Sequence, residues 1–193
     1  PGSVTVINED VIDDRAAQHL ESVLSTSPNI SYSSGASRAR FVQIRGIGDL
    51  EQFVDPKHFP AVGIMVDGIN LGGTANVGML FDVEQIEVAR GPQGTRFGTS
   101  ALAGMVNIRG NRPTESFEGY GQIGVGDYGS WHTRGVISGP MSEAVTGRLA
   151  VHQNKGDGYI NNQFLNRNDT NGYDETSIRA SIEFDPNDES SYG

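Results

Sequence analysis

Two glycine-rich runs in the second half of the sequence match the spacing of a dinucleotide-binding loop. Residues 119–124 and 124–129 both read G-x-G-x-x-G. In a nucleotide site such glycines let the backbone approach a pyrophosphate, and a helix must follow them. Here the glycines lie within alternating strand patterns and another strand follows, so we predict no nucleotide site. The passage 91–98 lacks a Gly-Lys-Ser/Thr triplet and is therefore no P-loop.

The residues that could hold a metal or act as a nucleophile form no recognisable constellation. The histidines are His19, His58, His132 and His152, and they share no ligand spacing. Ser100 lacks the spacing of a nucleophile elbow, and the stretch that holds Asp169 and Asp174 fails the EF-hand spacing. We therefore predict that the protein is not an enzyme and that it holds no metal or cofactor.

Two arginines beside glycines are the more informative chemical feature. Arg45 stands in Ile-Arg-Gly and Arg90 in Ala-Arg-Gly, each at the end of a predicted strand. A buried guanidinium at such a position requires a carboxylate or carbonyl partner. The alternative is an ordinary solvated arginine, which needs no partner.

Arg90 lies within the stretch around which the sequence is organised, residues 82–113. A short strand pattern at 85–88 is followed by a passage dense in glycine, and a second apolar strand pattern spans 105–108. Such a strand, turn and returning strand need backbone angles that glycine tolerates. The stretch predicts a tight turn between two strands.

The rest of residues 1–113 predicts a small mixed sheet with short helices. Asn8 is a candidate N-cap, and apolar residues at near-helical spacing predict one or two helices within 9–26. A further strand is expected to close in an Asp67–Gly68 turn. Strand patterns cover residues 4–7, 29–32, 41–48 and 61–68, and the pattern at 41–48 ends in glycine turns.

After Pro113 the pattern changes to antiparallel strands with one apolar and one polar face. Alternation is clear at 117–126, 147–152 and 177–184. Short turns at 139–142 and 185–188 contrast with a long Asn-rich loop at 161–174. This is typical of a transmembrane β-barrel, of which so short a stretch supplies too few strands to close. A soluble antiparallel sandwich is the alternative.

Composition limits the function classes further. The net charge is −10, with −3 on residues 1–113 and −7 on residues 114–193, which argues against nucleic-acid binding. Cysteine is absent, so no disulfide framework forms. No apolar run is long enough for a transmembrane helix, and no signal peptide is recognisable. Both ends look cut, and we expect a fragment of a larger protein.

Taken together, these motifs resemble the plug domain and first barrel strands of a TonB-dependent outer-membrane receptor, over essentially the whole chain. The resemblance rests on the order and spacing of four segments. They are Val4–Ile7, Ile44-Arg45-Gly46, Val66-Asp67-Gly68 and the longer motif Ile86–Ile108. The matching motif residues besides the arginines are Gly46, Asp67, Gly68, Glu87, Gly91, Gly94, Gly98, Gly104 and Asn107.

The resemblance implies an α+β plug at 1–113, followed at 114–193 by the N-terminal strands of a barrel of about 22 strands. It implies a ligand-gated transporter of the bacterial outer membrane that imports a scarce nutrient such as a ferric siderophore. An oligosaccharide or cobalamin receptor of the same family, or a soluble β-rich ligand-binding module, is the alternative.

The same resemblance implies partners and site roles. TonB, with ExbB and ExbD, would act through a TonB box that this sequence does not contain, and the barrel would contact outer-membrane lipid. Arg45 and Arg90 match arginines that pair with barrel-wall glutamates and latch the plug. An extracellular small-molecule or glycan ligand would meet the plug loops 35–40, 49–59 and 70–77.

Overall fold

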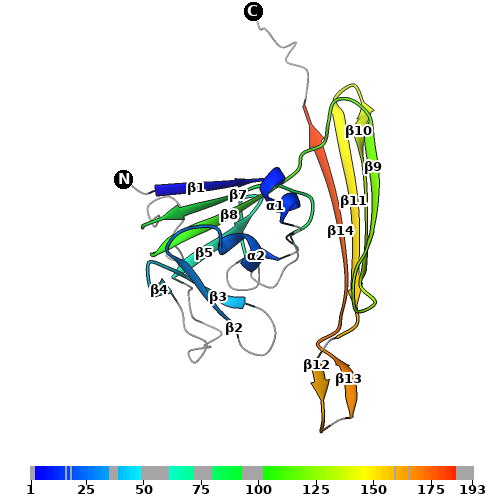
Figure 1. Ribbon diagram of the computed structural model, residues 1–193. Helices are drawn as coiled ribbons and strands as arrows, with labels where there is room; N and C mark the ends of the chain where they lie inside the picture. The colour runs from blue at the N-terminus through cyan, green and yellow to red at the C-terminus, as the bar shows by residue number, and fades with distance from the viewer. Residues whose placement is uncertain are drawn as a thin grey trace, which may run out of the picture. The chain divides into compact units, whose positions relative to one another are not determined.

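The structure is a computed structural model that describes residues 3–15, 17, 19–34, 39–48, 61–71, 80–92, 102–158, 160–164 and 166–185. The chain forms two compact units, Pro1–Asn111 and Arg112–Gly193. Figure 1 shows a mixed α/β arrangement in the first unit and long strands in the second. None of the helices in these ranges is long and apolar enough to cross a membrane.

The N-terminal unit is built on a five-stranded mixed sheet in the order β1-β7-β8-β5-β6. Its strands are β1 (Ser3–Asn8), β5 (Val62–Val66), β6 (Ile69–Asn70), β7 (Val83–Arg90) and β8 (Gly104–Gly110). The β5–β8 pair is parallel and the other pairs are antiparallel. The strands predicted at 85–88 and 105–108 thus pair directly, as β7 and β8.

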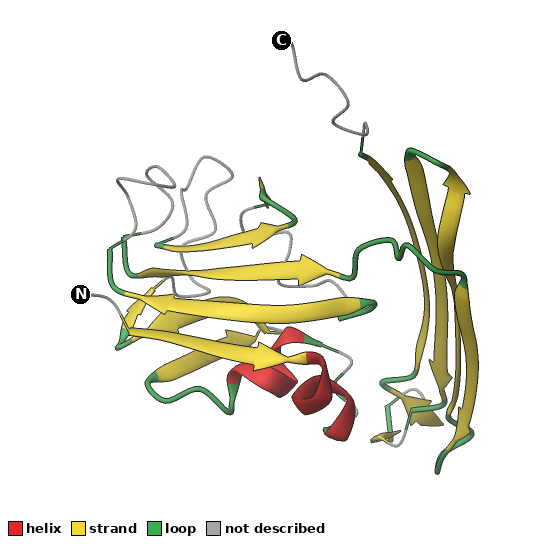
Figure 2. Ribbon diagram, turned by 90° about the horizontal axis from the view of Figure 1, so that it is seen from above, coloured by secondary structure: helices red, strands yellow, loops and turns green. Residues whose placement is uncertain are grey.

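Two short helices lie beside this sheet (Figure 2), where the sequence predicts them. They are α1 (Glu9–Asp14) and α2 (Leu20–Leu24). The side chain of Asn8 accepts a 3.3 Å hydrogen bond from the amide of Val11, which confirms the predicted N-cap. α2 ends at Leu24, within the range predicted for the helices.

A second sheet of three strands, β2 (Ile30–Ser34), β3 (Ala39–Ile44) and β4 (Ile47–Gly48), completes the described part of this unit. The sequence predicts a strand pattern over 41–48 that ends in glycine turns, and the structure divides this stretch into β3 and β4. Arg45 and Gly46 both have positive φ, 55° and 76°, so the chain turns back between β3 and β4. The alternation of side chains continues through the turn, which is why periodicity alone does not detect it.

One hydrophobic core joins the helices and both sheets of the N-terminal unit. Ile86, Val88 and Val106 of the central strands are fully buried. They belong to the same cluster as Val23 of α2 and Ile44 of β3. This core holds β7 and β8 rigidly, and therefore also the motif residues that these strands carry.

The C-terminal unit contains a four-stranded antiparallel sheet in the order β14-β11-β10-β9. The strands are β9 (Glu118–Val125), β10 (Trp131–Ser142), β11 (Val145–Gly156) and β14 (Tyr173–Phe184). A small hairpin, β12 (Ile160–Asn162) with β13 (Arg167–Thr170), lies between β11 and β14 in sequence. Figure 1 shows the four long strands side by side.

One turn prediction in this unit is wrong. Residues 139–142 were expected to form a turn, but they are the end of β10, and the turn lies at Glu143–Ala144. The register shifts between Pro140 and Ser142, and such an irregularity accommodates a proline inside a sheet. The long Asn-rich loop predicted at 161–174 lies almost wholly in the connection between β11 and β14, and it contains most of the β12–β13 hairpin.

Burial in the four-stranded sheet is the reverse of that in a soluble protein. Ile178 and Ile182 on one face of β14 are 69% and 71% exposed. On the opposite face, His152 and Asn154 of β11 are 1% and 2% exposed. A soluble sandwich buries the apolar faces of its sheets, so the predicted alternative of a sandwich does not fit the described sheet.

Candidate functional site

The side chain of Arg90 is buried and donates hydrogen bonds to three acceptors. It lies at the end of β7 and is 7% exposed. Its Nε donates to Ser3 Oγ at 3.0 Å, one terminal nitrogen donates to the carbonyl of Pro28 at 2.9 Å, and the other donates to Thr5 Oγ1. The guanidinium therefore connects the edge strand β1, the segment after α2 and the strand β7.

Arg45 has a different environment. Its side chain is exposed, and its backbone amide donates a 2.8 Å hydrogen bond to the carbonyl of Asn29. It occupies the first central position of the β3–β4 turn, with Gly46 at the second. The two arginines stand in similar sequence motifs, but they differ in burial: Arg90 is buried and Arg45 is exposed.

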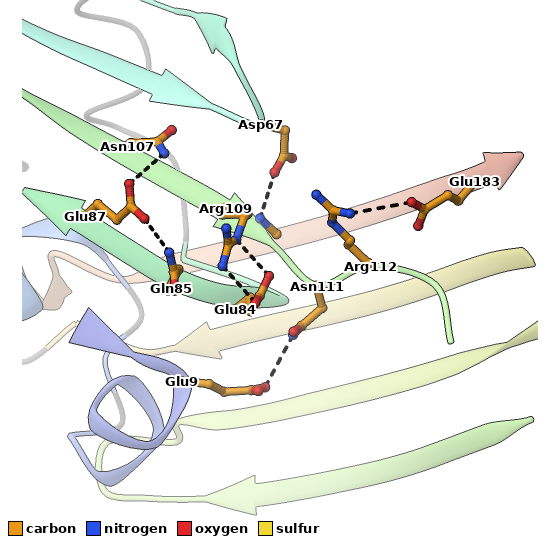
Figure 3. A network of polar contacts seen from close by, with 11 residues as sticks. Glu9, Asp67, Glu84, Gln85, Glu87, Asn107, Arg109, Asn111, Arg112 and Glu183 are labelled. Carbon is orange, nitrogen blue, oxygen red and sulfur yellow. Dashed lines mark hydrogen bonds and ion pairs between the residues drawn. The ribbon is translucent and has the colours of Figure 1, made fainter. Parts of the chain in front are cut away.

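Asp67 and Gly68 form the predicted tight turn, between β5 and β6. Their φ angles of 48° and 81° are those of a type I′ hairpin turn, which Asp-Gly favours. Asp67 Oδ1 accepts a 2.7 Å hydrogen bond from the amide of Gly110, and the Asp67 amide donates to the carbonyl of Ile108 at 2.9 Å. Asp67 thus fastens the turn to the end of β8 (Figure 3).

Glu87 and Asn107 face each other across the β7–β8 pair, and Figure 3 shows their side chains directed toward one another. Asn107 Nδ2 donates to one Glu87 oxygen at 3.3 Å, and Gln85 Nε2 donates to the other. These two motif residues therefore form a cross-strand polar pair, which stabilises the register of the central hairpin.

Gly91 and Gly104 lie at the ends of β7 and β8 nearest the glycine-rich passage. The amide of Gly91, which has φ 111°, donates to the carbonyl of Ala103 at 3.0 Å. A Cβ at Gly104 would collide with the carbonyl oxygen of Ala89 and with the side chain of Ile44. Gly94 and Gly98, with most of residues 35–40, 49–59 and 70–77, lie outside the described residues.

The sequence gives no signal for the ion pair between Arg109 and Glu84. Arg109 donates to both carboxylate oxygens of Glu84, at 2.9 and 3.0 Å (Figure 3). Asn111 donates to Asp82 Oδ1 at 3.1 Å and to Glu9 at 3.4 Å. The pairing of β7 with β8 and the contact of α1 with β7 bring these side chains together, and local sequence carries no signal for either.

The residues considered for catalysis and metal binding are described only in part by the structure. No group of three or more His, Cys, Asp or Glu suited to a metal ion occurs within the described ranges. His132 and His152 lie on adjacent strands in an edge-to-face contact, with ring centroids 6.4 Å apart. Asp174 pairs with Lys155 at 3.2 Å, while Ser100 and His58 lie outside the described residues.

The family model for the TonB-dependent receptor plug domain matches residues 1–105, more than half of the chain. The chain belongs to this family. Its members are receptors and transporters rather than enzymes. The predicted fold is therefore confirmed: an α+β plug is followed by antiparallel strands of an incomplete barrel.

Among curated relatives, the chain is 29% identical to the pesticin receptor of Yersinia pestis over 93% of its length. It is 25% identical to the vitamin B12 transporter BtuB of Vibrio vulnificus over 96% of its length. The chain spans 26% and 30% of these two proteins, respectively.

Two solved structures of outer-membrane receptors have a similar fold over nearly the whole chain. The ferric yersiniabactin uptake receptor FyuA from Yersinia pestis is similar with a TM-score of 0.85 and 25% identity, over 97% of this chain and 29% of that one. The pyoverdine outer membrane receptor FpvA of Pseudomonas aeruginosa, bound to pyoverdine, is similar with a TM-score of 0.77 and 21% identity, over 97% of this chain and 26% of that one. The plug and its barrel strands are part of an outer-membrane protein.

Proposed function

We propose that the chain is the N-terminal part of a TonB-dependent, ligand-gated transporter that imports a ferric siderophore. The likeness to FyuA, a ferric yersiniabactin uptake receptor, over 97% of the chain supports the proposal most directly. The plug would close the barrel lumen until a ligand binds outside and TonB, energised by ExbB and ExbD, acts from the periplasm. On this proposal the protein has no enzymatic activity.

Uptake measurements test the substrate. A strain that lacks the gene, complemented with the whole receptor, should accumulate radioactive iron from at least one ferric siderophore, and removal of tonB should abolish that accumulation. Cobalamin is the second candidate, because the vitamin B12 transporter of Vibrio vulnificus matches 96% of the chain. Uptake of labelled cobalamin without iron uptake would replace the siderophore proposal, and TonB-independent uptake would contradict both.

We also propose that the apolar face of the β9–β10–β11–β14 sheet contacts the lipid bilayer. Ile123 and Val125 of β9, Ile178 and Ile182 of β14, and Phe184 are all more than 65% exposed. Exposed apolar side chains on one face, with buried polar side chains on the other, are the arrangement of a barrel whose lumen is polar.

We propose Arg45, rather than Arg90, as the latch between plug and barrel wall. The Arg45 guanidinium is exposed, whereas that of Arg90 already donates to three acceptors within the plug. Arg45→Gln in the whole receptor should therefore change ligand-driven uptake, while Arg45→Lys preserves the charge. Unchanged uptake and unchanged plug retention in Arg45→Gln would remove the latch.

A further inference from the structure

We propose that the segment between the two units is an anchored hinge, which one buried serine attaches to the four-stranded sheet. β8 ends at Gly110 and β9 begins at Glu118. The boundary between the units falls between Asn111 and Arg112. Hydrogen bonds hold the chain on both sides of Arg112 and Pro113, so the hinge is confined to these two residues. Its consequence for transport rests on the proposed function, whereas the anchor itself does not.

Asn111 fastens the N-terminal side of the hinge to the plug. Its amide donates to the carbonyl of Asp82 at 3.0 Å, and its side chain donates to Asp82 Oδ1 at 3.1 Å. Asp82 is 7% exposed and directly precedes β7. The amide of the preceding residue, Gly110, donates to Asp67 Oδ1 at 2.7 Å. The start of β7 and the β5–β6 turn therefore both hold the end of the plug.

Thr114 fastens the C-terminal side of the hinge to the sheet. Its amide donates to Ser138 Oγ at 2.9 Å, and the hydroxyls of the two residues are hydrogen-bonded at 2.8 Å. Ser138 of β10 is 3% exposed, so this contact is shielded from water. Arg112 Nη1 lies 3.6 Å from Glu183 Oε1 of β14 (Figure 3), but both side chains are largely exposed, and such an ion pair contributes little. Ser138 is therefore the stronger of these two attachments.

The hinge is short and stiff. Three Cα–Cα steps of about 3.8 Å separate Asn111 from Thr114, so their Cα atoms stay within about 11 Å of each other. Proline fixes its own φ and restricts the residue before it, which limits rotation further. Without the anchor, the next residue held by the sheet is Glu118, and the same limit rises to about 25 Å. Ser138 thus shortens the free linker by more than half.

The anchor determines where the plug pivots when TonB acts on it. Thr114 belongs to the same compact unit as the sheet, whereas Asn111 belongs to the plug. A movement of one unit against the other therefore takes place at Arg112 and Pro113 and leaves the contact of Thr114 with Ser138 closed. The C-terminal end of the plug stays attached to the sheet throughout uptake, and a covalent bond in place of the anchor does not block transport.

Amide hydrogen exchange in the whole receptor tests the anchor without any ligand. Ser138→Ala removes the acceptor of the Thr114 amide, whose exchange should become about tenfold faster, as expected for one lost hydrogen bond. Ser181→Ala is the matched control. Both serines pair with Arg148, from opposite sides of β11, but the buried Ser181 hydroxyl has no hydrogen-bond partner among the described residues. Ser181→Ala should exchange as wild type, and equal exchange of the Thr114 amide in the two variants would overturn the anchor.

A disulfide in place of the hydroxyl pair tests whether the anchor stays closed during transport. The two hydroxyl oxygens are near enough for the sulfurs of Thr114→Cys and Ser138→Cys to bond, and the chain has no cysteine of its own. The oxidised double variant should accumulate the ferric siderophore used by wild type at an unchanged rate, with Ser138→Cys alone as the control. Loss of uptake that reduction restores would show that the anchor must open, and would overturn the hinge. Absence of uptake by wild type itself would refute the proposed function, and the exchange measurement would still decide the anchor.

Discussion

The guanidinium of Arg90 donates a 2.9 Å hydrogen bond to the carbonyl of Pro28, 62 residues earlier in the chain. The same side chain binds the hydroxyls of Ser3 and Thr5 on β1. The edge strand of the plug is therefore held by backbone pairing with β7 and by a buried cation at one end of that pairing.

Arg90→Gln should weaken this arrangement. The substitution removes charge-assisted hydrogen bonds at a buried position, and we expect the free energy of unfolding to fall by about 3 kcal/mol. Amide hydrogen exchange in the whole receptor should increase for residues 3–8 more than for β8, because the lost contacts hold β1.

Arg109→Gln is the matched control for Arg90→Gln. Its ion pair with Glu84 is about 40% exposed on each side, so its loss should cost roughly 0–1 kcal/mol. Equal changes in the exchange of β1 for both variants would contradict the role assigned to Arg90.

Gly104→Ala should destabilise the plug by several kcal/mol, on the order of 2–4, because the new methyl group meets the backbone of Ala89. Gly135→Ala offers a comparison on β10, since a Cβ there meets nothing within 4 Å. Denaturation midpoints of the two variants in the whole receptor provide the measurement. A Gly104→Ala variant as stable as Gly135→Ala would mean that the close approach is absent.

Asp67→Ala should cost about 2–3 kcal/mol, since it leaves the amide of Gly110 without its acceptor and places alanine at positive φ. Asp67→Asn keeps an acceptor oxygen and tolerates the left-handed backbone, so its loss should stay below about 1 kcal/mol. Thermal unfolding measures the loss of stability in each variant. Equal losses would show that a neutral acceptor oxygen at this position contributes no stability.

Arg45→Asn should raise the free energy of unfolding by about 0.5–1 kcal/mol. Arg45 has φ 55°, a conformation that asparagine adopts more readily than arginine, and Asn-Gly is a preferred pair in this kind of turn. Equilibrium denaturation checks the gain, with Arg45→Lys expected to change little. A loss of stability in Arg45→Asn would indicate that the guanidinium makes a stabilising contact in the whole receptor.

Ile178→Lys should impair assembly of the receptor into membranes, because a lysine facing lipid costs about 2–4 kcal/mol near the bilayer midplane. Ser177→Lys places the same charge on the opposite face of β14 and should assemble nearly as well as wild type. The fraction of heat-modifiable, protease-resistant receptor in outer membranes measures the difference. Equal assembly of the two variants would contradict the lipid-facing assignment.

The sequence by itself determined the features that depend on neighbouring residues. Asn8 caps α1, and Asp67–Gly68 forms a hairpin turn, since a side-chain acceptor and a positive φ are local properties. The alternation in 177–184 likewise located most of β14 and the two faces of that strand. Glycine also marked the end of the strand pattern at 41–48, although the side-chain alternation continues through the Arg45–Gly46 turn.

Tertiary structure decided which distant groups meet and which faces are covered. The parallel β5–β8 pair, the Glu84–Arg109 ion pair and the contacts of Arg90 with Pro28 and Ser3 all depend on strand register and chain path. Alternation shows that a strand has two faces, but it does not say which one is buried. That Ile178 is exposed while His152 is buried follows only from the assembled structure, because burial is a property of the neighbours rather than of the residue.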